Sequence, residues 1–171
     1  MTRNLVVAVI LLVVLAAGCG GGEETMTAPE TAGELTVDNV TANLALPSDT
    51  GAVYMHITNG GDVDDALIDA AIDGCGTIEL HEMINENDTM MMRQVEGNRI
   101  PVPAGETVML QRGGLHVMCI GKTGEFTIGQ SVPVTLTFEK AGTMQVMADV
   151  LDPAELGMDM SGGGMGTDET P

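Results

Sequence analysis

The sequence predicts an all-β domain, built as a sandwich or barrel, over residues 34–150 of a 171-residue chain. Short runs rich in β-branched and aliphatic residues alternate there with clusters of Gly, Pro, Asn and Asp, a spacing that is typical of such folds. No long helical periodicity and no internal repeat interrupts this pattern. Aromatic residues make up only 2 % of the chain, so Val, Ile, Leu, Ala and Met are expected to form the core. We therefore expect a single domain of ordinary size with additional segments at both ends.

Each expected strand is bounded by residues that favour turns. Residues 59–62 and 73–76 contain Gly, Asn and Asp, which tolerate a positive φ. The polar segment Asn85–Asp88 lies between two candidate strands and indicates a hairpin. Pro101 and Pro103 cannot donate a ladder hydrogen bond and argue against a central strand there. The candidate strands are Leu35–Val40, Ala52–Asn59, Ala66–Ile72, Thr77–Met83, Met90–Val95, Thr107–Leu110, His116–Ile120, Val132–Phe138 and Thr143–Val150.

The first 18 residues have the features of a lipoprotein signal peptide. Arg3 gives a short positive region, and Leu5–Ala17 is an uncharged apolar run that is too short for a typical membrane span. Small residues then precede Cys19, as in a bacterial lipobox whose cysteine becomes lipidated. An ordinary cleaved signal peptide is the alternative. Residues 19–33 are predicted to be a flexible tether, which would place the domain outside the cytoplasm, in the periplasm or at the cell surface, anchored to a membrane by lipid.

The charge and the last residues limit the function further. A formal net charge of −19 argues against nucleic-acid partners, because a polyanion would be repelled. Residues 151–171 contain few apolar groups and are predicted to be a disordered tail rich in Met and Gly. Met158, Met160 and Met165 in this tail offer thioether sulfur, a soft ligand that favours Cu(I), so they could form a weak copper site, or they could be incidental.

Two of the three histidines are each followed two positions later by a methionine. His81 precedes Met83, and His116 precedes Met118. Side chains two positions apart on a strand point to the same face, so each pair can direct an imidazole and a thioether towards one point. The run Met90–Met92 would return beside the first pair if the polar segment turns the chain. Thioether sulfur is a soft ligand that favours Cu(I), so the pattern predicts a copper site. A methionine-rich hydrophobic cluster with both histidines at its rim is the alternative.

These residues resemble the motif of the PCuAC-type periplasmic copper chaperones. Ten residues separate His81 from Met92, as that motif requires, and 23 residues separate Met92 from His116, two more than in the motif. The resemblance covers most of residues 35–150. It implies a cupredoxin-like Greek-key β-barrel that binds Cu(I) through His81, Met92, His116 and Met118. Met83 and Met90 are additional candidate ligands.

The resemblance also implies a role. The protein would deliver copper to an accepting protein. The acceptors implied are subunit II of a haem-copper oxidase, which holds a binuclear copper centre, and a thioredoxin-like copper chaperone. The sequence contains no G-x-S-x-G motif, no complete H-E-x-x-H motif and no phosphate-binding Gly loop, so we do not expect an enzyme. A lipid-anchored structural or adhesion sandwich and a small copper redox protein are the alternatives. His56 is expected to be a surface residue and not a ligand.

Cys75 and Cys119 remain after the lipobox cysteine. In an oxidising compartment they could form a disulfide if their strands are neighbours, and free thiols or thiolate copper ligands are the alternatives. Cys119 follows His116 and Met118, whereas a blue-copper site usually has its ligands in the order Cys, His, Met. This order argues against an electron-transfer site.

Overall fold

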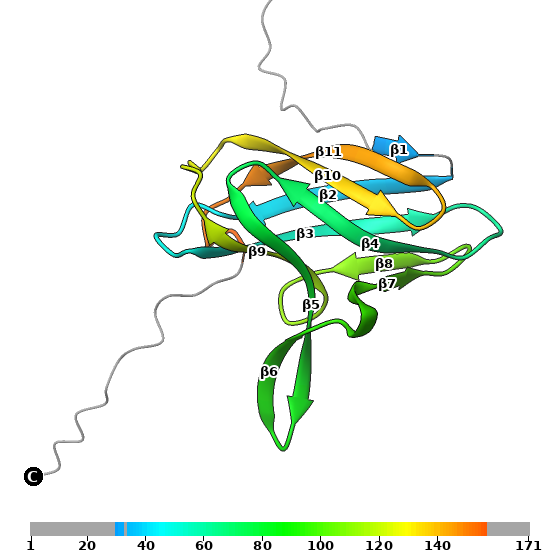
Figure 1. Cartoon of the computed structure of the whole chain (residues 1–171), viewed down its shortest axis with the longest axis horizontal. Coiled ribbons are helices and arrows are strands. Elements are labelled where there is room, and N and C mark those ends of the chain that lie inside the picture. Colours follow the sequence, from blue (N-terminus) through cyan, green and yellow to red (C-terminus); the bar gives the residue numbers. More distant parts are fainter. Residues whose placement is uncertain (1–29, 33, 157–171) are drawn as a thin grey trace, which may run out of the picture.

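The computed structural model describes residues 30–32 and 34–156. These residues form eleven strands and one short 3₁₀ helix, which confirms the predicted all-β class (Figure 1). The elements are β1 (Glu30–Ala32), β2 (Leu35–Asn43), β3 (Thr50–Asn59), β4 (Asp65–Ile72), β5 (Cys75–Glu86), β6 (Thr89–Gln94), η1 (Glu96–Asn98), β7 (Ile100–Val102), β8 (Thr107–Leu110), β9 (His116–Lys122), β10 (Ser131–Phe138) and β11 (Gly142–Val150).

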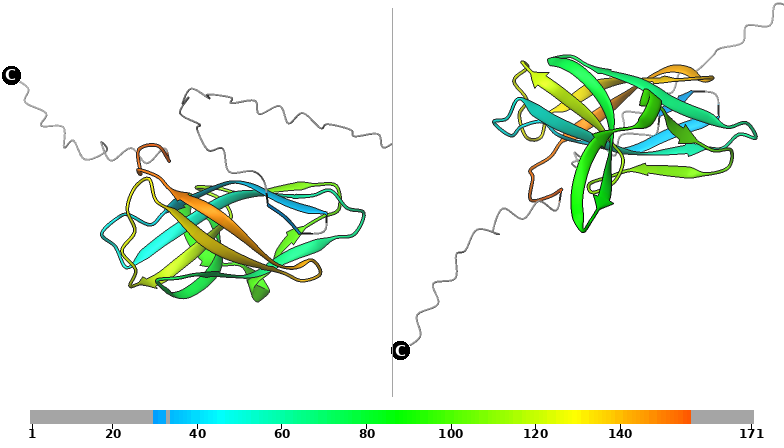
Figure 2. Two further views of the ribbon diagram at one scale, coloured as in Figure 1. Left: turned by 90° about the horizontal axis from the view of Figure 1, so that it is seen from above. Right: turned by 60° about the horizontal axis from the view of Figure 1, so that its bottom comes forward.

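All of these strands belong to one sheet. Its order is β6-β5-β9-β3-β2-β11-β10-β4-β7, with β1 beside β2 and β8 beside β3. Strands distant in sequence are therefore neighbours, as β5 and β9 or β10 and β4 are, and such crossovers characterise Greek-key sheets. The pair β11–β2 is parallel, in contrast to the antiparallel pairs that make up the rest of the described sheet. The sheet curls over itself, so that β4 and β10 lie across β2 and β3 (Figures 1 and 2).

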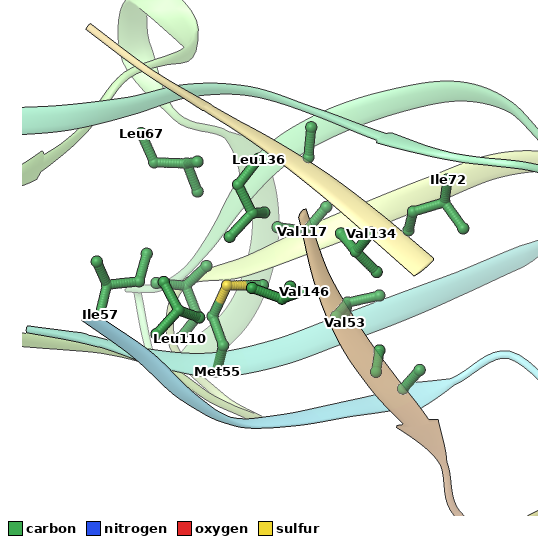
Figure 3. Packing of buried hydrophobic residues seen from close by; sticks show 14 of the residues in the cluster. Val53, Met55, Ile57, Leu67, Ile72, Leu110, Val117, Val134, Leu136 and Val146 are labelled. Atoms are coloured by element: carbon green, nitrogen blue, oxygen red, sulfur yellow. The ribbon is translucent and has the colours of Figure 1, made fainter. Parts of the chain in front are cut away.

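The curled sheet encloses an aliphatic core. Val53, Met55 and Ile57 alternate along β3 and are fully buried, as the period of two along a strand requires. They form one cluster with Leu136 of β10 and with Val117 of the neighbouring strand β9 (Figure 3). The described part of the chain thus has one hydrophobic core, in agreement with the single domain predicted from the sequence.

A long hairpin, β5–β6, extends from the body of the sheet (Figures 1 and 2). Its turn consists of Asn87 and Asp88, whose φ angles are 53° and 62°. Two successive positive φ angles are typical of the type I′ turn that joins antiparallel strands through two residues. The predicted hairpin is confirmed, although both strands run closer to the turn than the sequence suggested. Met83 consequently lies directly opposite Met92.

Two short strands were not expected. β7 forms around Pro101 and lies at an end of the sheet order, where a residue without an amide hydrogen is tolerated. β1 pairs with β2 and lies within residues 19–33, which were predicted to be a tether. At the other end, the first residues of the predicted disordered tail are ordered, and Pro153 is buried. The predicted signal peptide, Cys19 and the tail methionines lie outside the described residues.

Lys122 holds the segment between β2 and β3. Its ammonium group donates to the carbonyls of Leu44 and Leu46, the latter at 2.6 Å. Burial lowers the pKa of this amine, partly offset by the nearby carboxylate of Asp49. The other lysine of the chain, Lys140, also donates to a backbone carbonyl, at the β3–β4 connection. The Lys122 contacts fix one wall of the site described below.

No helix within residues 30–32 and 34–156 is long and apolar enough to span a membrane.

Candidate metal centre

The strand register brings the two His-x-Met pairs together. β5 and β9 are antiparallel neighbours, and His81 of β5 lies directly opposite His116 of β9. The centroids of their rings are 5.8 Å apart, with the ring planes inclined at 77°. On its other side β5 pairs with β6, which places Met92 opposite Met83. These residues therefore project from one face of three adjacent strands, as the spacing within each pair predicted. They are His81, Met83, Met92 and His116.

His116 presents a free ring nitrogen to a thioether. Its Nδ1 lies 3.0 Å from the carbonyl oxygen of Gly114, which can only accept, so Nδ1 carries the proton. Nε2 of the neutral ring then has a lone pair, and it lies 3.1 Å from Sδ of Met92. A nitrogen lone pair and a sulfur lone pair meet here without a hydrogen between them. This arrangement suits a shared soft metal ion, for which both atoms are donors.

Burial keeps His116 in the neutral form that a metal requires. Only 5 % of the residue is exposed. Burial is the main cause that lowers the pKa of His116, and the neighbouring His81 lowers it further, while the hydrogen bond to Gly114 acts in the opposite direction. Because a ligating imidazole must be unprotonated, the lowered pKa extends the pH range in which His116 can bind a metal.

His81 is oriented by a carboxylate. Its Nε2 lies 2.7 Å from Oε2 of Glu79, while its Nδ1 is buried and has no hydrogen-bond partner among the described residues. Metal-ligating histidines commonly use one ring nitrogen to bind a carboxylate, which leaves the other for the metal. Glu79 was not among the residues predicted for the site. It precedes His81 by two positions, so the same rule that linked His81 to Met83 could have identified it.

Four thioethers and one imidazole line a common cavity of about 430 Å³. They belong to Met83, Met90, Met92, Met118 and His116. The described part of the chain contains no group of three or more His, Cys, Asp or Glu side chains that could hold a metal ion. The soft donors that line this cavity are thioether sulfur and imidazole nitrogen, which is the donor chemistry expected from the sequence. Met83 and Met90, predicted as additional ligands, line the same cavity as Met92, His116 and Met118, whereas His81 does not line it.

Two further residues at the cavity were not predicted. The ring centroid of Tyr54 lies 6.4 Å from that of His116, and burial raises the pKa of this phenol although the Arg112 charge opposes the shift. Arg112 itself lines the cavity and brings a positive charge to it. No local sequence pattern connects these residues to the histidines, since they reach the cavity from β3 and from the loop before β9.

A disulfide lies behind the site. Cys75 and Cys119 are bonded, with their Cα atoms 5.5 Å apart, and thereby join β5 to β9. Cys119 follows Met118 on β9 and is fully buried on the opposite, core-facing side. Of the alternatives left open by the sequence, the structure therefore contains the disulfide, and Cys119 has no thiolate to offer a metal.

His56 lies apart from this cavity. Its Nδ1 contacts Asn39 at 3.0 Å and Asp38 at 3.4 Å, both on β2, and its side chain is 37 % exposed. It lines a separate cavity that contains neither of the other histidines. This position agrees with its expected role as a surface residue.

The family of the chain follows from its sequence. A family model described as "Putative lipoprotein LpqE-like" matches residues 35–150. The chain belongs to the LpqE-like family. A relative of this LpqE-like chain, "Putative lipoprotein Lxx21020" from Leifsonia xyli subsp. xyli, is 29 % identical over 101 residues. The match covers 59 % of this chain and 60 % of the relative, so the LpqE-like chain spans less than two thirds of that protein.

Solved structures share the fold of the LpqE-like domain, and PCuAC domains are among them. The apo PCuAC domain from PmoF1 is 21 % identical with a TM-score of 0.63, and the match covers 74 % of this chain and 100 % of that domain. The copper-bound PCuAC domain from PmoF2 is 22 % identical with a TM-score of 0.62, at the same coverage. The Cu(I) form of DR1885 from Deinococcus radiodurans is 31 % identical with a TM-score of 0.51, covering 66 % of this chain and 74 % of DR1885. The resemblance inferred from the His and Met motif is confirmed.

Proposed function

We propose that this protein is a Cu(I) chaperone, anchored by lipid outside the cytoplasm, that delivers copper to an accepting protein. The observation that carries the proposal is the 3.1 Å approach of His116 Nε2 to Met92 Sδ, beside a second imidazole and a second His-x-Met thioether. Two similar structures support it, because the PmoF2 domain was solved with copper and DR1885 with Cu(I).

The donor atoms favour Cu(I) over Cu(II). Imidazole nitrogens and thioether sulfurs carry no charge, and the only described cysteines are bonded to each other. A ligand set without charge leaves the charge of the ion uncompensated, which costs less for a singly charged ion than for a doubly charged one. Thioether sulfur is also a soft donor, which favours Cu(I). His81, Met92, His116 and Met118 would hold the ion.

The exposure of the methionines supports a carrier and not an enzyme. Met90 is 53 % exposed and Met92 is 47 % exposed, so an accepting protein can reach a bound ion from the hairpin side. We infer that the acceptor supplies replacement ligands of its own. The binuclear copper centre of a haem-copper oxidase, and a thioredoxin-like copper chaperone, are the acceptors that the PCuAC resemblance implies.

Both alternative functions fit the structure less well. A structural sandwich with a methionine-rich core would bury these thioethers, whereas the core is aliphatic and Met90, Met91 and Met92 are exposed. A blue-copper redox centre needs a thiolate, and Cys119 is engaged in the disulfide.

Membrane anchoring rests on the lipobox at Cys19 and on the word lipoprotein in the family description. Metabolic labelling with an alkyne fatty acid tests it directly. We expect label in the native chain and none in Cys19→Ala. Equal labelling of both chains would contradict the anchor without affecting the copper site.

Anaerobic competition with a chromophoric Cu(I) chelator tests the copper site. We expect the full chain to bind one Cu(I) tightly and His116→Ala to bind it at least about a hundredfold more weakly, equivalent to about 2.7 kcal/mol. His56→Ala is the matched control, because His56 lines another cavity, and it should bind like the native chain. Native affinity in His116→Ala would overturn the site, and no Cu(I) binding by the native chain would overturn the function.

A further inference from the structure

The cavity contains more soft donors than one ion needs. His116, Met92 and Met118 line it, and His81 lies directly opposite His116, which makes four donors, yet Met83 and Met90 contribute two further thioethers. We propose that Met83, Met90 and Met92 form a second, outer Cu(I) position on the β5–β6 hairpin, through which the ion enters and leaves the inner histidine site. This inference rests on the proposed function.

The hairpin register brings the three thioethers together. Met83 lies directly opposite Met92, and Met90 lies opposite Asn85, two positions further along the same face. Directly opposed residues have Cβ atoms about 5 Å apart, and diagonal neighbours are about 7–8 Å apart. Methionine side chains have three rotatable bonds and can converge across such distances. Met91 lies opposite Ile84 and points to the other face of the hairpin.

The two positions differ in their accessibility. Pairing of β5 with β9 ends at His81 and His116, and the hairpin continues beyond that point towards its turn. Figure 1 shows this part of β5 and β6 standing clear of the remaining strands. The histidines are 9 % and 5 % exposed, whereas Met90 and Met92 are about half exposed. An ion from solution or from a partner would therefore meet the three thioethers before it meets the imidazoles.

Met92 belongs to both positions and can act as the shared ligand. As the ion moves outward, Cu–N bonds to the imidazoles break while Cu–S bonds to Met83 and Met90 form, and the bond to Met92 persists. Copper remains Cu(I) throughout, so no electron acceptor is needed. All donors remain neutral, and no proton is released or taken up. The outer position lacks imidazole, so its ion should be held more weakly and exchange faster than the inner one.

Methionine methyl resonances can distinguish the two positions. The full chain is labelled with ¹³C at the methionine ε-methyl groups and titrated anaerobically with Cu(I), with Met158, Met160 and Met165 changed to Leu so that the tail cannot contribute. We expect the first equivalent to shift Met92 and Met118, and a second, weaker equivalent to shift Met83 and Met90. Met91, which points away from both positions, should not respond. Absence of a second binding step, or an equal response of Met91, would overturn the proposal.

Transfer kinetics provide a second test in the same background. The double variant Met83→Leu/Met90→Leu keeps apolar side chains of similar volume but removes two thioethers. We expect it to lose the second equivalent and to pass the first to a chromophoric Cu(I) chelator about tenfold more slowly. Met91→Leu is the matched control, because it removes a thioether of the same hairpin from the opposite face. Unchanged stoichiometry and rate in the double variant, or an equal loss in Met91→Leu, would overturn the outer position. A native chain that binds one Cu(I) tightly would still satisfy the proposed function in that case.

Discussion

The two His-x-Met pairs have the same spacing in sequence but different surroundings. His116 and Met118 lie on β9, between β5 and β3 in the middle of the sheet. His81 lies where β5 leaves β9, and Met83 follows on the hairpin that extends beyond it. The imidazoles are also held differently. Nδ1 of His116 contacts a neutral backbone carbonyl, whereas Nε2 of His81 contacts the carboxylate of Glu79.

This difference shows that spacing determines the face of a side chain but not its role. Met118 has strands on both sides and lies half-buried between them, and it lines the same cavity as His116. Met83 lies on β5 beyond the part that pairs with β9, so its neighbour there is β6. β6 is the edge strand of the sheet. We therefore assign the second pair to a fixed inner site and Met83 to an exchangeable position.

Removing the disulfide should have the largest effect, because it joins the two strands that carry the pairs. Cys75 and Cys119 enclose a segment with a sequence separation of 44. Loss of a bridge of this span should lower the free energy of unfolding by about 3–4 kcal/mol. We expect Cys75→Ala/Cys119→Ala to show this loss in urea denaturation of the metal-free chain. A denaturation midpoint equal to that of the native chain would mean that the bridge does not stabilise the β5–β9 pair.

The two methionines of the pairs should contribute unequally to the first copper equivalent. We expect Met118→Leu to weaken Cu(I) binding about a hundredfold, which corresponds to about 2.7 kcal/mol, because it removes an inner donor. Met83→Leu should weaken the same step much less, since it changes the hairpin position. Chelator competition measures both affinities. Equal losses in the two variants would show that Met118 and Met83 contribute equally to the inner site, which would contradict an exchangeable position for Met83.

The carboxylate on His81 should have a smaller effect. Glu79→Gln keeps a hydrogen-bonding group beside Nε2 but removes its charge, so Cu(I) affinity should fall about tenfold. Glu82→Gln is the matched control. Glu82 is three positions along the same strand, faces the other way and pairs with Arg93 at 2.9 Å. Its loss should leave Cu(I) affinity unchanged, and a tenfold loss in both variants would assign the effect to net charge instead of to His81.

The pH dependence of His116 should be the smallest effect. Burial is the first cause that lowers its pKa below the ordinary value of 6.5, so the unfolded chain takes up a proton at a pH where the folded chain does not. Stability should therefore rise with pH in this window and fall as the pH drops from 6.5 towards the folded-state pKa. His116→Gln should show a weaker fall over that range. Imidazole NMR resonances of the metal-free chain provide the direct measurement, and a His116 midpoint at or above 6.5 would contradict the assignment.

Much of the site was predictable from the sequence because it depends on strand periodicity. The period of two placed His81 with Met83 and His116 with Met118, and the polar turn at Asn87 returned the methionine run to the first pair. The pairing of β5 with β9 could not be read from local patterns, because it depends on a crossover fixed by core packing.

Other features were missed for identifiable reasons. Glu79 lies two positions before His81, so the period of two along a strand could have predicted that both side chains share a face. Tyr54 and Arg112 reach the cavity only through tertiary structure. β7 was not expected because Pro101 is a poor strand former, and the sequence does not reveal that this strand lies at a sheet edge. The choice of disulfide over free thiols also required knowledge that the two strands are neighbours.

The positions of the two lysines affect how this acidic chain meets other molecules. Lys122 and Lys140 donate to backbone carbonyls, so they hold loops and form no ion pair with a carboxylate in the described structure. The whole chain carries a formal net charge of −19, and among the described residues Arg93 and Arg99 pair with Glu82 and Glu139. Such a field attracts small cations and basic protein surfaces over a screening distance of about 8 Å at physiological ionic strength. Encounter with a basic copper acceptor should then slow as salt is added, whereas an acidic acceptor or an anionic copper complex should be repelled.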